Sequence, residues 1–233
     1  MNLQDLKKKT IRDALKIEDS FGYILVFIDF ANVNYWFEED QYDSDNNVLA
    51  ENEKLVIDIQ KLKEFADIFS SDVRFYYGHD SENKKSIGFL IATRKIYGKM
   101  RVFTKPIQKV RHYLSNEETI SNTRILEHDA GGDFIRIPKC NFDVEICVDA
   151  IKLMENYDTL CLFSSDADFV HLVRFLKRNN KNHKGKKVIL VKGGYIHHSL
   201  YEMADLIVNA QNIKKHITIK KQKPGIKPGF ANR

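Results

Sequence analysis

One stretch constrains the fold of this chain more than any other: Tyr157 to Phe169, with the sequence YDTLCLFSSDADF. Residues 159–163 form a short run bounded by polar residues, which is typical of a fully buried strand. Two serines and two aspartates follow directly, and apolar residues at helical spacing resume at Phe169. A buried strand, an acidic turn and a helix form half of an α/β unit. In open parallel sheets ligands bind beyond the carboxyl ends of the strands, so this turn is predicted to lie in a functional crevice.

The same alternation of strands and helices recurs along the chain. The apolar runs that read as strands lie near 24–29, 72–77, 100–106, 159–163 and 187–191, and 206–208 reads as a small edge strand. Segments with helical periodicity lie between them. This pattern predicts an α/β fold, a doubly wound parallel sheet of about five strands with helices on both faces. We expect the strand order 3-2-1-4-5, numbered along the chain, because it makes the first and fourth strands central neighbours.

The chain is predicted to form one domain with two extensions. Residues 1–20 read as an N-terminal helical extension and residues 21–210 as the domain. Residues 211–233 form a basic tail with two Pro-Gly pairs, which we expect to be disordered. Leu55 to Phe69 has helical periodicity. The segment 108–138 has a weak pattern and reads as an insertion or a small hairpin.

Several classes of protein are excluded by what the sequence lacks. No segment reaches the roughly 20 apolar residues of a membrane span, and the charged N-terminus has no signal-peptide core. The three cysteines, Cys140, Cys147 and Cys161, have no CxxC spacing and are expected to be reduced core residues. The sequence therefore predicts a cytoplasmic protein without a zinc site or a membrane partner.

The net charge of +5 is unevenly distributed. The segments 94–111 and 177–192 each carry seven Lys/Arg and no acid, and so does the chain from residue 211 onward. One such run is usually a solvated face, but three beside an acidic site favour a polyanionic partner. The predicted nucleic-acid-binding residues are Arg94, Lys95, Lys105, Lys109, Lys186, Lys187 and Lys192.

Four aspartates are predicted to meet at the carboxyl edge of the sheet. Asp29 ends the first strand, Asp143 lies in the first turn of a helix, and Asp166 and Asp168 follow the fourth strand. Four bare carboxylates would repel one another, and a hard divalent cation relieves that conflict. Oxygen ligands of this kind suit Mg²⁺ or Mn²⁺. Asn32 lies three residues beyond Asp29, where it could cap a helix or reach the same ion.

Asp149 is a weaker candidate for the site. It lies six residues after Asp143, roughly 9 Å further along the helix and turned by about 120°. Glu145, Asp149 and Lys152 form one stripe, and for Glu145 and Lys152 we favour a solvent face with ion pairs. Asp143 is therefore the better candidate on this helix.

These residues resemble the NYN-domain proteins of the LabA/DUF88-like group, within the PIN-like nuclease superfamily. The matching pieces span about 20 to 210 and are VFIDFANVN (26–34), RFYYG (74–78), KCNFDVEICVDA (139–150), YDTLCLFSSDADFVHLV (157–173), KKVILV (186–191) and HHSLYEMADLIV (197–208). The resemblance implies a Rossmann-like sheet, Mg²⁺ or Mn²⁺ at clustered aspartates, and RNA cleavage. It assigns the acidic site to Asp29 with Asn32, Asp143, Asp166 and Asp168, and Asp149 falls on a commonly acidic position. Ser165 and Ala167 stand where the family usually has glycine and serine.

Two functions remain open at this point. In the first, the chain is a metal-dependent ribonuclease acting on single-stranded RNA, as a monomer or a homodimer. Asp29 and Asp166 would then hold the ion, Asp143 and Asp168 would complete its shell or orient water, and Ser164 would support the carboxylates. In the second, the acidic pocket belongs to a catalytically silent module that binds RNA or a protein partner. A haloacid-dehalogenase-type phosphatase is rejected, because the DxDxT motif is absent after the first strand.

Overall fold

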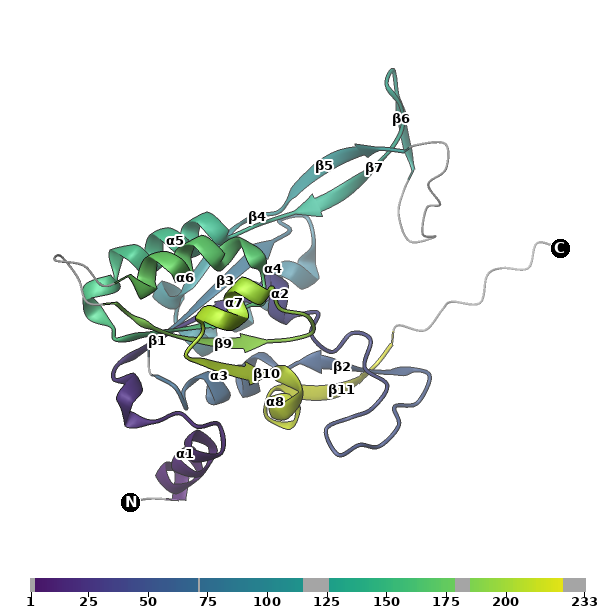
Figure 1. The fold of residues 1–233 in the computed structure, drawn as a ribbon. Coiled ribbons are helices and arrows are strands. Elements are labelled where there is room, and N and C mark those ends of the chain that lie inside the picture. Colours follow the sequence, from purple (N-terminus) through teal and green to yellow (C-terminus); the bar gives the residue numbers. More distant parts are fainter. Residues whose placement is uncertain (1–2, 71, 115–125, 179–184, 224–233) are drawn as a thin grey trace.

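The computed structural model describes residues 3–70, 72–114, 126–178 and 185–223. Its centre is a six-stranded, all-parallel sheet (Figure 1). In spatial order the strands are β10 (Leu206–Asn209), β9 (Lys187–Lys192), β8 (Thr159–Phe163), β1 (Ile24–Asp29), β3 (Val73–His79) and β4 (Val102–Pro106). The predicted order of five strands is confirmed, and the predicted edge strand adds β10 beside β9.

The two central strands are adjacent and completely buried. β1 and β8 pair in parallel from Ile24 opposite Thr159 to Ile28 opposite Phe163, and every residue of both strands is buried. Strands buried on both faces are near-continuous apolar runs, because helices cover both sides of the sheet. This is why the sequence identified them clearly.

Two apolar cores occupy the two faces of the sheet. On one face, alternate strand residues such as Val26 and Cys161 pack against α2 (Phe30–Val33), α3 (Ile59–Ala66), α4 (Lys84–Tyr97) and α8 (Ala210–Ile217). On the other face, residues such as Phe27 and Leu162 pack against α5 (Asp143–Lys152), α6 (Val170–Lys177) and α7 (His198–Met203). The alternation follows from the two-residue period of a strand. Helices on both faces are thus confirmed.

Short 3-10 helices join several of these elements. They are η1 (Asp19–Phe21), η2 (Lys99–Arg101), η3 (Met154–Asn156) and η4 (Ala167–Phe169). The N-terminal extension contains α1 (Leu3–Ala14), which is tied to the domain by a hydrogen bond of 3.0 Å from Arg12 Nη1 to the carbonyl oxygen of Ile68. Cys161 is buried as expected, whereas Cys140 and Cys147 are only half-buried. Among the described residues, no helix is long and apolar enough to cross a bilayer.

The C-terminal segment is the main correction to the sequence analysis. Residues 211–222 were predicted to be disordered, but they continue α8 and form β11 (Thr218–Gln222). β11 pairs in antiparallel fashion with β2 (Glu53–Ile57), so residues 55–57 are a strand and not the start of a helix. The many lysines of this segment suggested a disordered tail, but Ile213 and Ile217 are four residues apart and both buried. The remainder of the predicted tail, 224–233, lies outside the described residues.

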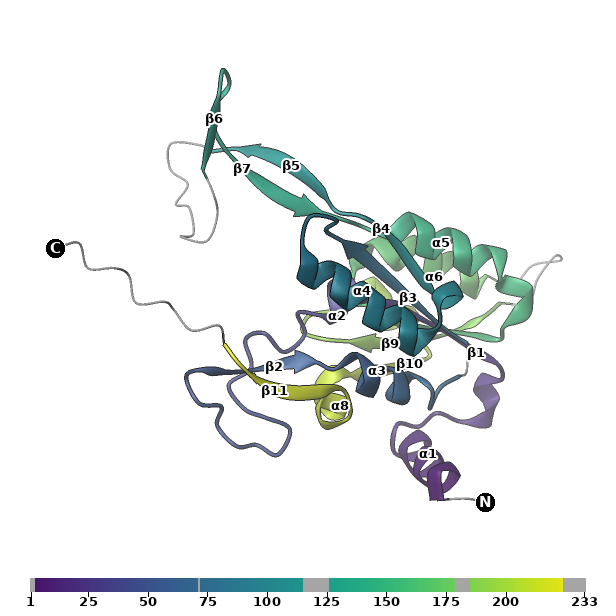
Figure 2. The same ribbon diagram turned by 180° about the vertical axis from the view of Figure 1, so that it is seen from behind.

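The segment 108–138 is the hairpin that the sequence suggested, extended by one strand. β5 (Gln108–Tyr113), β7 (Gly132–Lys139) and β6 (Glu127–Asp129) form a three-stranded antiparallel sheet in the order β5-β7-β6. This arm projects from the domain (Figures 1 and 2). It leaves from the carboxyl end of β4 and returns immediately before α5, so it borders the carboxyl edge of the main sheet.

Candidate active site

Three of the predicted aspartates lie together at the carboxyl edge of the sheet. Asp143 is the first residue of α5, while Asp166 and Asp168 lie in the turn after β8. One carboxylate oxygen from each lies within 4.8 Å of the others. Each comes from the point where a strand ends or a helix begins, and such points meet at one edge in a parallel sheet.

Local hydrogen bonds fix the backbone of this cluster. The Asp168 backbone N–H donates to Asp166 Oδ1 at 3.0 Å, so Asp166 caps η4. The Asp143 backbone N–H donates to Asn141 Oδ1 at 2.7 Å, which satisfies a donor in the first turn of α5. Both hydrogen bonds join residues that are two positions apart in the sequence, and they hold the carboxylates at the sheet edge.

Asp29 lies beside this cluster, at the end of β1, with only 6% of its surface exposed. The pKa of its carboxyl is raised from 3.8 to about 6, mainly by burial and also by the charges of Asp143 and Asp166, while the hydrogen bond from Ser164 lowers it. Ser164 Oγ donates to Asp29 Oδ2 at 3.2 Å and accepts from the Asp166 backbone N–H at 3.3 Å. Ser164 therefore links Asp29, at the end of β1, to the backbone of Asp166, after β8, in the way that its predicted supporting role requires.

The cluster carries negative charge without a basic partner among the described residues. Burial, followed by the charges of Asp166 and Asp168, raises the pKa of Asp143. Like charges and burial both disfavour the ionised form of these carboxyl groups. A bound cation would stabilise the ionised form and offset the repulsion between them. All donors are carboxylate oxygens, which suit a hard divalent ion rather than zinc. The residues present therefore fit Mg²⁺ or Mn²⁺.

Asn32 lies close to Asp29, whose pKa its backbone lowers. The side chain has partners of its own: its Oδ1 accepts from Trp36 Nε1 at 2.9 Å and from the Ser165 backbone N–H at 3.3 Å, and Ser165 Oγ lies 3.4 Å away. Asn32 thus links the turn after β8 to the segment after α2, and its role as a metal ligand stays a prediction.

Ser165 extends this network to the loop after β9. Its hydroxyl lies 3.2 Å from the carbonyl oxygen of Gly193. A Cβ at Gly193 would come within 2.3 Å of the Trp36 ring, so only glycine fits against the indole. The serine that departs from the family pattern thus joins two loops at the sheet edge.

Asp149 and Glu145 lie on α5 but make separate contacts. Asp149 Oδ2 accepts from Tyr76 OH at 2.8 Å and pairs with Arg74 Nη1 at 3.2 Å. Glu145 pairs with Lys105 Nζ at 2.6 Å. The sequence placed Glu145 in an ion pair with its own helix, whereas its partner comes from β4.

The seven predicted nucleic-acid-binding residues do not share one surface. Lys105, Lys109 and Lys192 lie at the carboxyl edge, near the ends of β4 and β9 and the start of β5. Arg94 and Lys95 lie in the last turn of α4, and Lys186 and Lys187 at the start of β9. A crossover helix runs back to the amino edge, so these four lie at the opposite edge from the aspartates.

Two exposed tyrosines follow elements that end at the carboxyl edge of the sheet, and the sequence analysis did not consider them. Tyr35 is 62% exposed and follows α2, and Tyr195 is 81% exposed and lies in the loop after β9. They flank the contact of Trp36 with Gly193. The available signal was their position, with Tyr35 three residues beyond Asn32 and Tyr195 two residues beyond Gly193.

Comparison with known families decides the relationship. The model of the NYN domain matches residues 23–205, most of the chain. This chain belongs to the NYN domain family. Its fold is that of PIN-like nucleases, and the acidic cluster of Asp143, Asp166 and Asp168 is present.

The NYN fold also has a counterpart among solved structures. A crystal structure of a protein of unknown function from Vibrio parahaemolyticus matches with a TM-score of 0.51 and 21% sequence identity. The match covers 84% of this chain and 95% of that chain. At this identity the likeness concerns the fold alone. Among curated proteins none matches the chain.

Proposed function

We propose that this NYN-domain protein is a metal-dependent ribonuclease that hydrolyses RNA phosphodiester bonds. The observation that carries the proposal is the meeting of Asp143, Asp166 and Asp168 within 4.8 Å, beside the buried Asp29. These four carboxylates would hold Mg²⁺ or Mn²⁺. When bound, the ion lowers the pKa of water and offsets negative charge on the phosphodiester.

The aspartates and the serine of the site would have different roles. Asp143, Asp166 and Asp168 supply the oxygen ligands, since their carboxylates converge. Asp29 would complete that set or accept a proton from the attacking water, because its carboxylate lies beside the other three. Ser164 positions Asp29 through its hydrogen bond.

Single-stranded RNA is the substrate that the sheet edge favours. Tyr35 and Tyr195 offer exposed rings on which unpaired bases can stack. Lys192, Lys105 and Lys109 lie along the same edge and supply positive charge, although Lys105 and Lys109 are also paired with acids of the chain. Unpaired bases can reach such rings, whereas the bases of a duplex are already stacked.

The test is cleavage of an unstructured RNA with Mn²⁺, Mg²⁺ or EDTA. Cleavage should require the metal and should disappear in Asp166→Asn, which keeps the side-chain shape but removes one charge from the ion. Glu145→Gln on the same edge is the matched control and should cleave normally. Metal-dependent RNA binding without cleavage by the unmodified chain would instead support the catalytically silent module.

A further inference from the structure

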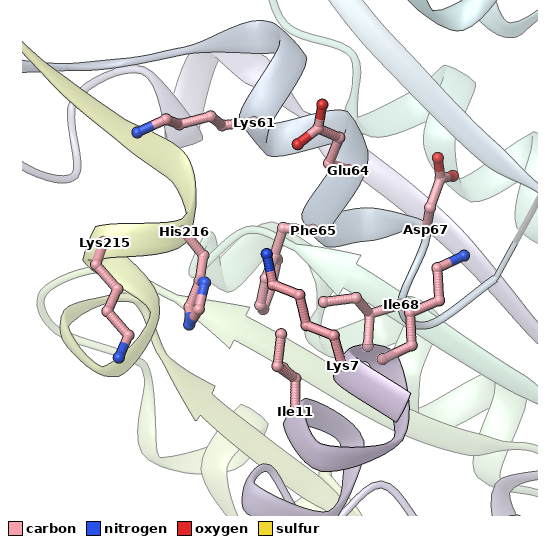
Figure 3. A pocket seen from close by; sticks show the side chains of 10 residues that line it. Lys7, Ile11, Lys61, Glu64, Phe65, Asp67, Ile68, Lys215 and His216 are labelled. Atoms are coloured by element: carbon pink, nitrogen blue, oxygen red, sulfur yellow. The ribbon is translucent and has the colours of Figure 1, made fainter. Parts of the chain in front are cut away.

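A second concave site lies away from the aspartates, between α1, α3 and α8 (Figure 3). Two of these three helices, α1 and α8, lie outside residues 23–205, the part matched by the NYN family model. The pocket is therefore built by the extensions of this chain around the family core. Its volume of about 480 Å³ falls in the range of small-molecule sites.

The pocket has an apolar floor that includes two rings. Phe65 of α3 and His216 of α8 are stacked, with centroids 6.0 Å apart and an interplanar angle of 19°. Ile11 of α1 and Ile68 complete the apolar lining. Figure 3 shows Phe65 and His216 between the lysines of the three helices. Phe65 is only 2% exposed, so the half-buried Ile11 and His216 offer most of the surface on which a planar apolar group could pack.

The rim of the pocket is basic. Four lysines line it, which are Lys7, Lys8, Lys61 and Lys215. Within the described part of the chain, the ammonium groups of Lys7, Lys8 and Lys215 form no hydrogen bond or ion pair. Lys61 Nζ donates to the carbonyl oxygen of Thr218 at 2.9 Å, which leaves its charge uncompensated.

Two acids also line the pocket. Asp67 pairs with Lys63 at 2.6 Å, whereas Glu64 accepts a hydrogen bond of 3.0 Å from the neutral Gln60 amide and keeps its charge, so four lysines face one uncompensated acid. The pKa of His216 is lowered by burial and by the charges of Lys215, Lys7 and Lys61. Lysines of three helices thus line the pocket and lower the pKa of its histidine.

We propose that this pocket binds a nucleotide, with the base against Ile11 and His216 and the phosphates beside the unpaired lysines of α1 and α8. A half-buried aromatic ring and a cationic rim match the two halves of that ligand, because bases stack on aromatic side chains and phosphates pair with lysine. The nucleotide is either a free mononucleotide or the phosphorylated end of an RNA chain. Neither the metal nor the aspartates take part.

Calorimetric titration of the full chain with ADP, adenosine and inorganic pyrophosphate tests the site. EDTA is present throughout, so that metal-bound phosphate cannot occupy the acidic cluster. ADP should bind at one site, and Lys7→Glu and Lys215→Glu should each weaken ADP binding at least about tenfold. Lys9→Glu on the same helix does not line this pocket and should leave ADP binding unchanged.

A second set of measurements separates the two halves and the source of the ligand. His216→Ala should weaken binding of ADP but not of pyrophosphate, because it removes a ring and no phosphate contact. If a 5′-phosphorylated RNA trinucleotide displaces ADP, the natural ligand is the end of an RNA chain. If it does not, the ligand is a free nucleotide. Lys7 and Lys215 are exposed, so Lys7→Gln and Lys215→Gln provide folded variants if charge reversal disturbs the helices. ADP binding that is absent at about 1 mM, or unchanged in both lysine variants, would overturn the proposal.

Discussion

Asp149 Oδ2 accepts a hydrogen bond of 2.8 Å from the hydroxyl of Tyr76, a residue that is completely buried. The same oxygen pairs with Arg74, so one carboxylate joins α5 to β3. Burial and, after it, Asp149 raise the pKa of Tyr76, so the phenol remains a donor. The acid at a commonly acidic family position therefore stabilises the packing of α5, the helix that presents Asp143.

Replacement of Asp149 is expected to affect stability more than cleavage. Asp149→Asn keeps an acceptor for Tyr76 but loses the charge opposite Arg74, which should cost about 1–2 kcal/mol of unfolding free energy. Asp149→Leu also leaves the Tyr76 hydroxyl unpaired and should cost more. Urea unfolding measures both, with Glu145→Gln as a control on the same helix. Cleavage by Asp149→Asn should stay close to normal, and a loss equal to that of Asp166→Asn would place Asp149 in the site.

The stability of the metal-free protein is expected to depend on Asp29. Its pKa is about 6 in the folded chain and near 3.8 when unfolded, so folding disfavours the charged form. Below about pH 4 this group therefore does not change the free energy of unfolding. As the pH rises from 4 to 6 the free energy of unfolding falls, and above pH 6 it is about 3 kcal/mol lower than at pH 4 because of this group. Asp29→Asn removes this dependence. In EDTA the variant should be the more stable protein at pH 7.5 but not at pH 4.

The comparison of the two proteins measures Asp29 together with its interaction with Asp143. Asp143 also has a raised pKa and contributes in the same direction, and because the charges of the two carboxylates interact, the difference includes that interaction as well as the ionisation of Asp29. Urea unfolding at several pH values gives the required free energies. A difference between variant and wild type that does not change with pH would mean that Asp29 ionises normally.

The central sheet could be predicted because its physical signals are local. β1 and β8 are continuous apolar runs, and the turns that follow them carry the acids, so both the strand order and the edge follow from topology rules. The cluster of Asp143, Asp166 and Asp168 depends on the same rules. Ser164 could be named for the same reason.

The features that the sequence did not reveal depend on contacts between segments that lie far apart in the chain. β2 and β11 are strands only because they pair across more than 150 residues, and each alone reads as helix or tail. The partner of Asp149 lies 73 residues away on β3, which helical geometry on α5 cannot reveal. Charge runs likewise do not reveal where a lysine lies: Lys105 and Lys186 belong to similar runs but lie at opposite edges of the sheet.

Ile217 tests the folded state of the C-terminal segment. It is completely buried at the end of α8, immediately before β11. Ile217→Ala should lower the unfolding free energy by about 2–4 kcal/mol, because it removes buried methyl groups and leaves a cavity. Lys221→Ala, in exposed β11, should change it by less than about 0.5 kcal/mol. Equal stability of both variants would mean that α8 does not pack in solution.

Lys192 and Lys186 test which edge of the sheet contacts RNA. Lys192 ends β9 at the carboxyl edge, whereas Lys186 precedes β9 at the amino edge. If RNA follows the acidic edge, Lys192→Ala should weaken binding and reduce the slope of log K against log salt by about 0.7, the value for one phosphate of a single strand. Lys186→Ala should change neither. Binding titrations at several salt concentrations with Asp166→Asn, which cannot cleave, provide the slopes.

Tyr35 and Tyr195 test the preference for single-stranded RNA. Base stacking on an exposed ring contributes about 1–3 kcal/mol, so Tyr35→Ala and Tyr195→Ala should each weaken single-strand binding by about 5- to 150-fold. Tyr23 is also exposed but precedes β1 at the amino edge, and Tyr23→Ala should bind normally. Duplex RNA should be affected far less, because its bases are already stacked. Equal losses for single-stranded and duplex RNA would mean that the tyrosines contact the backbone and do not select unpaired bases.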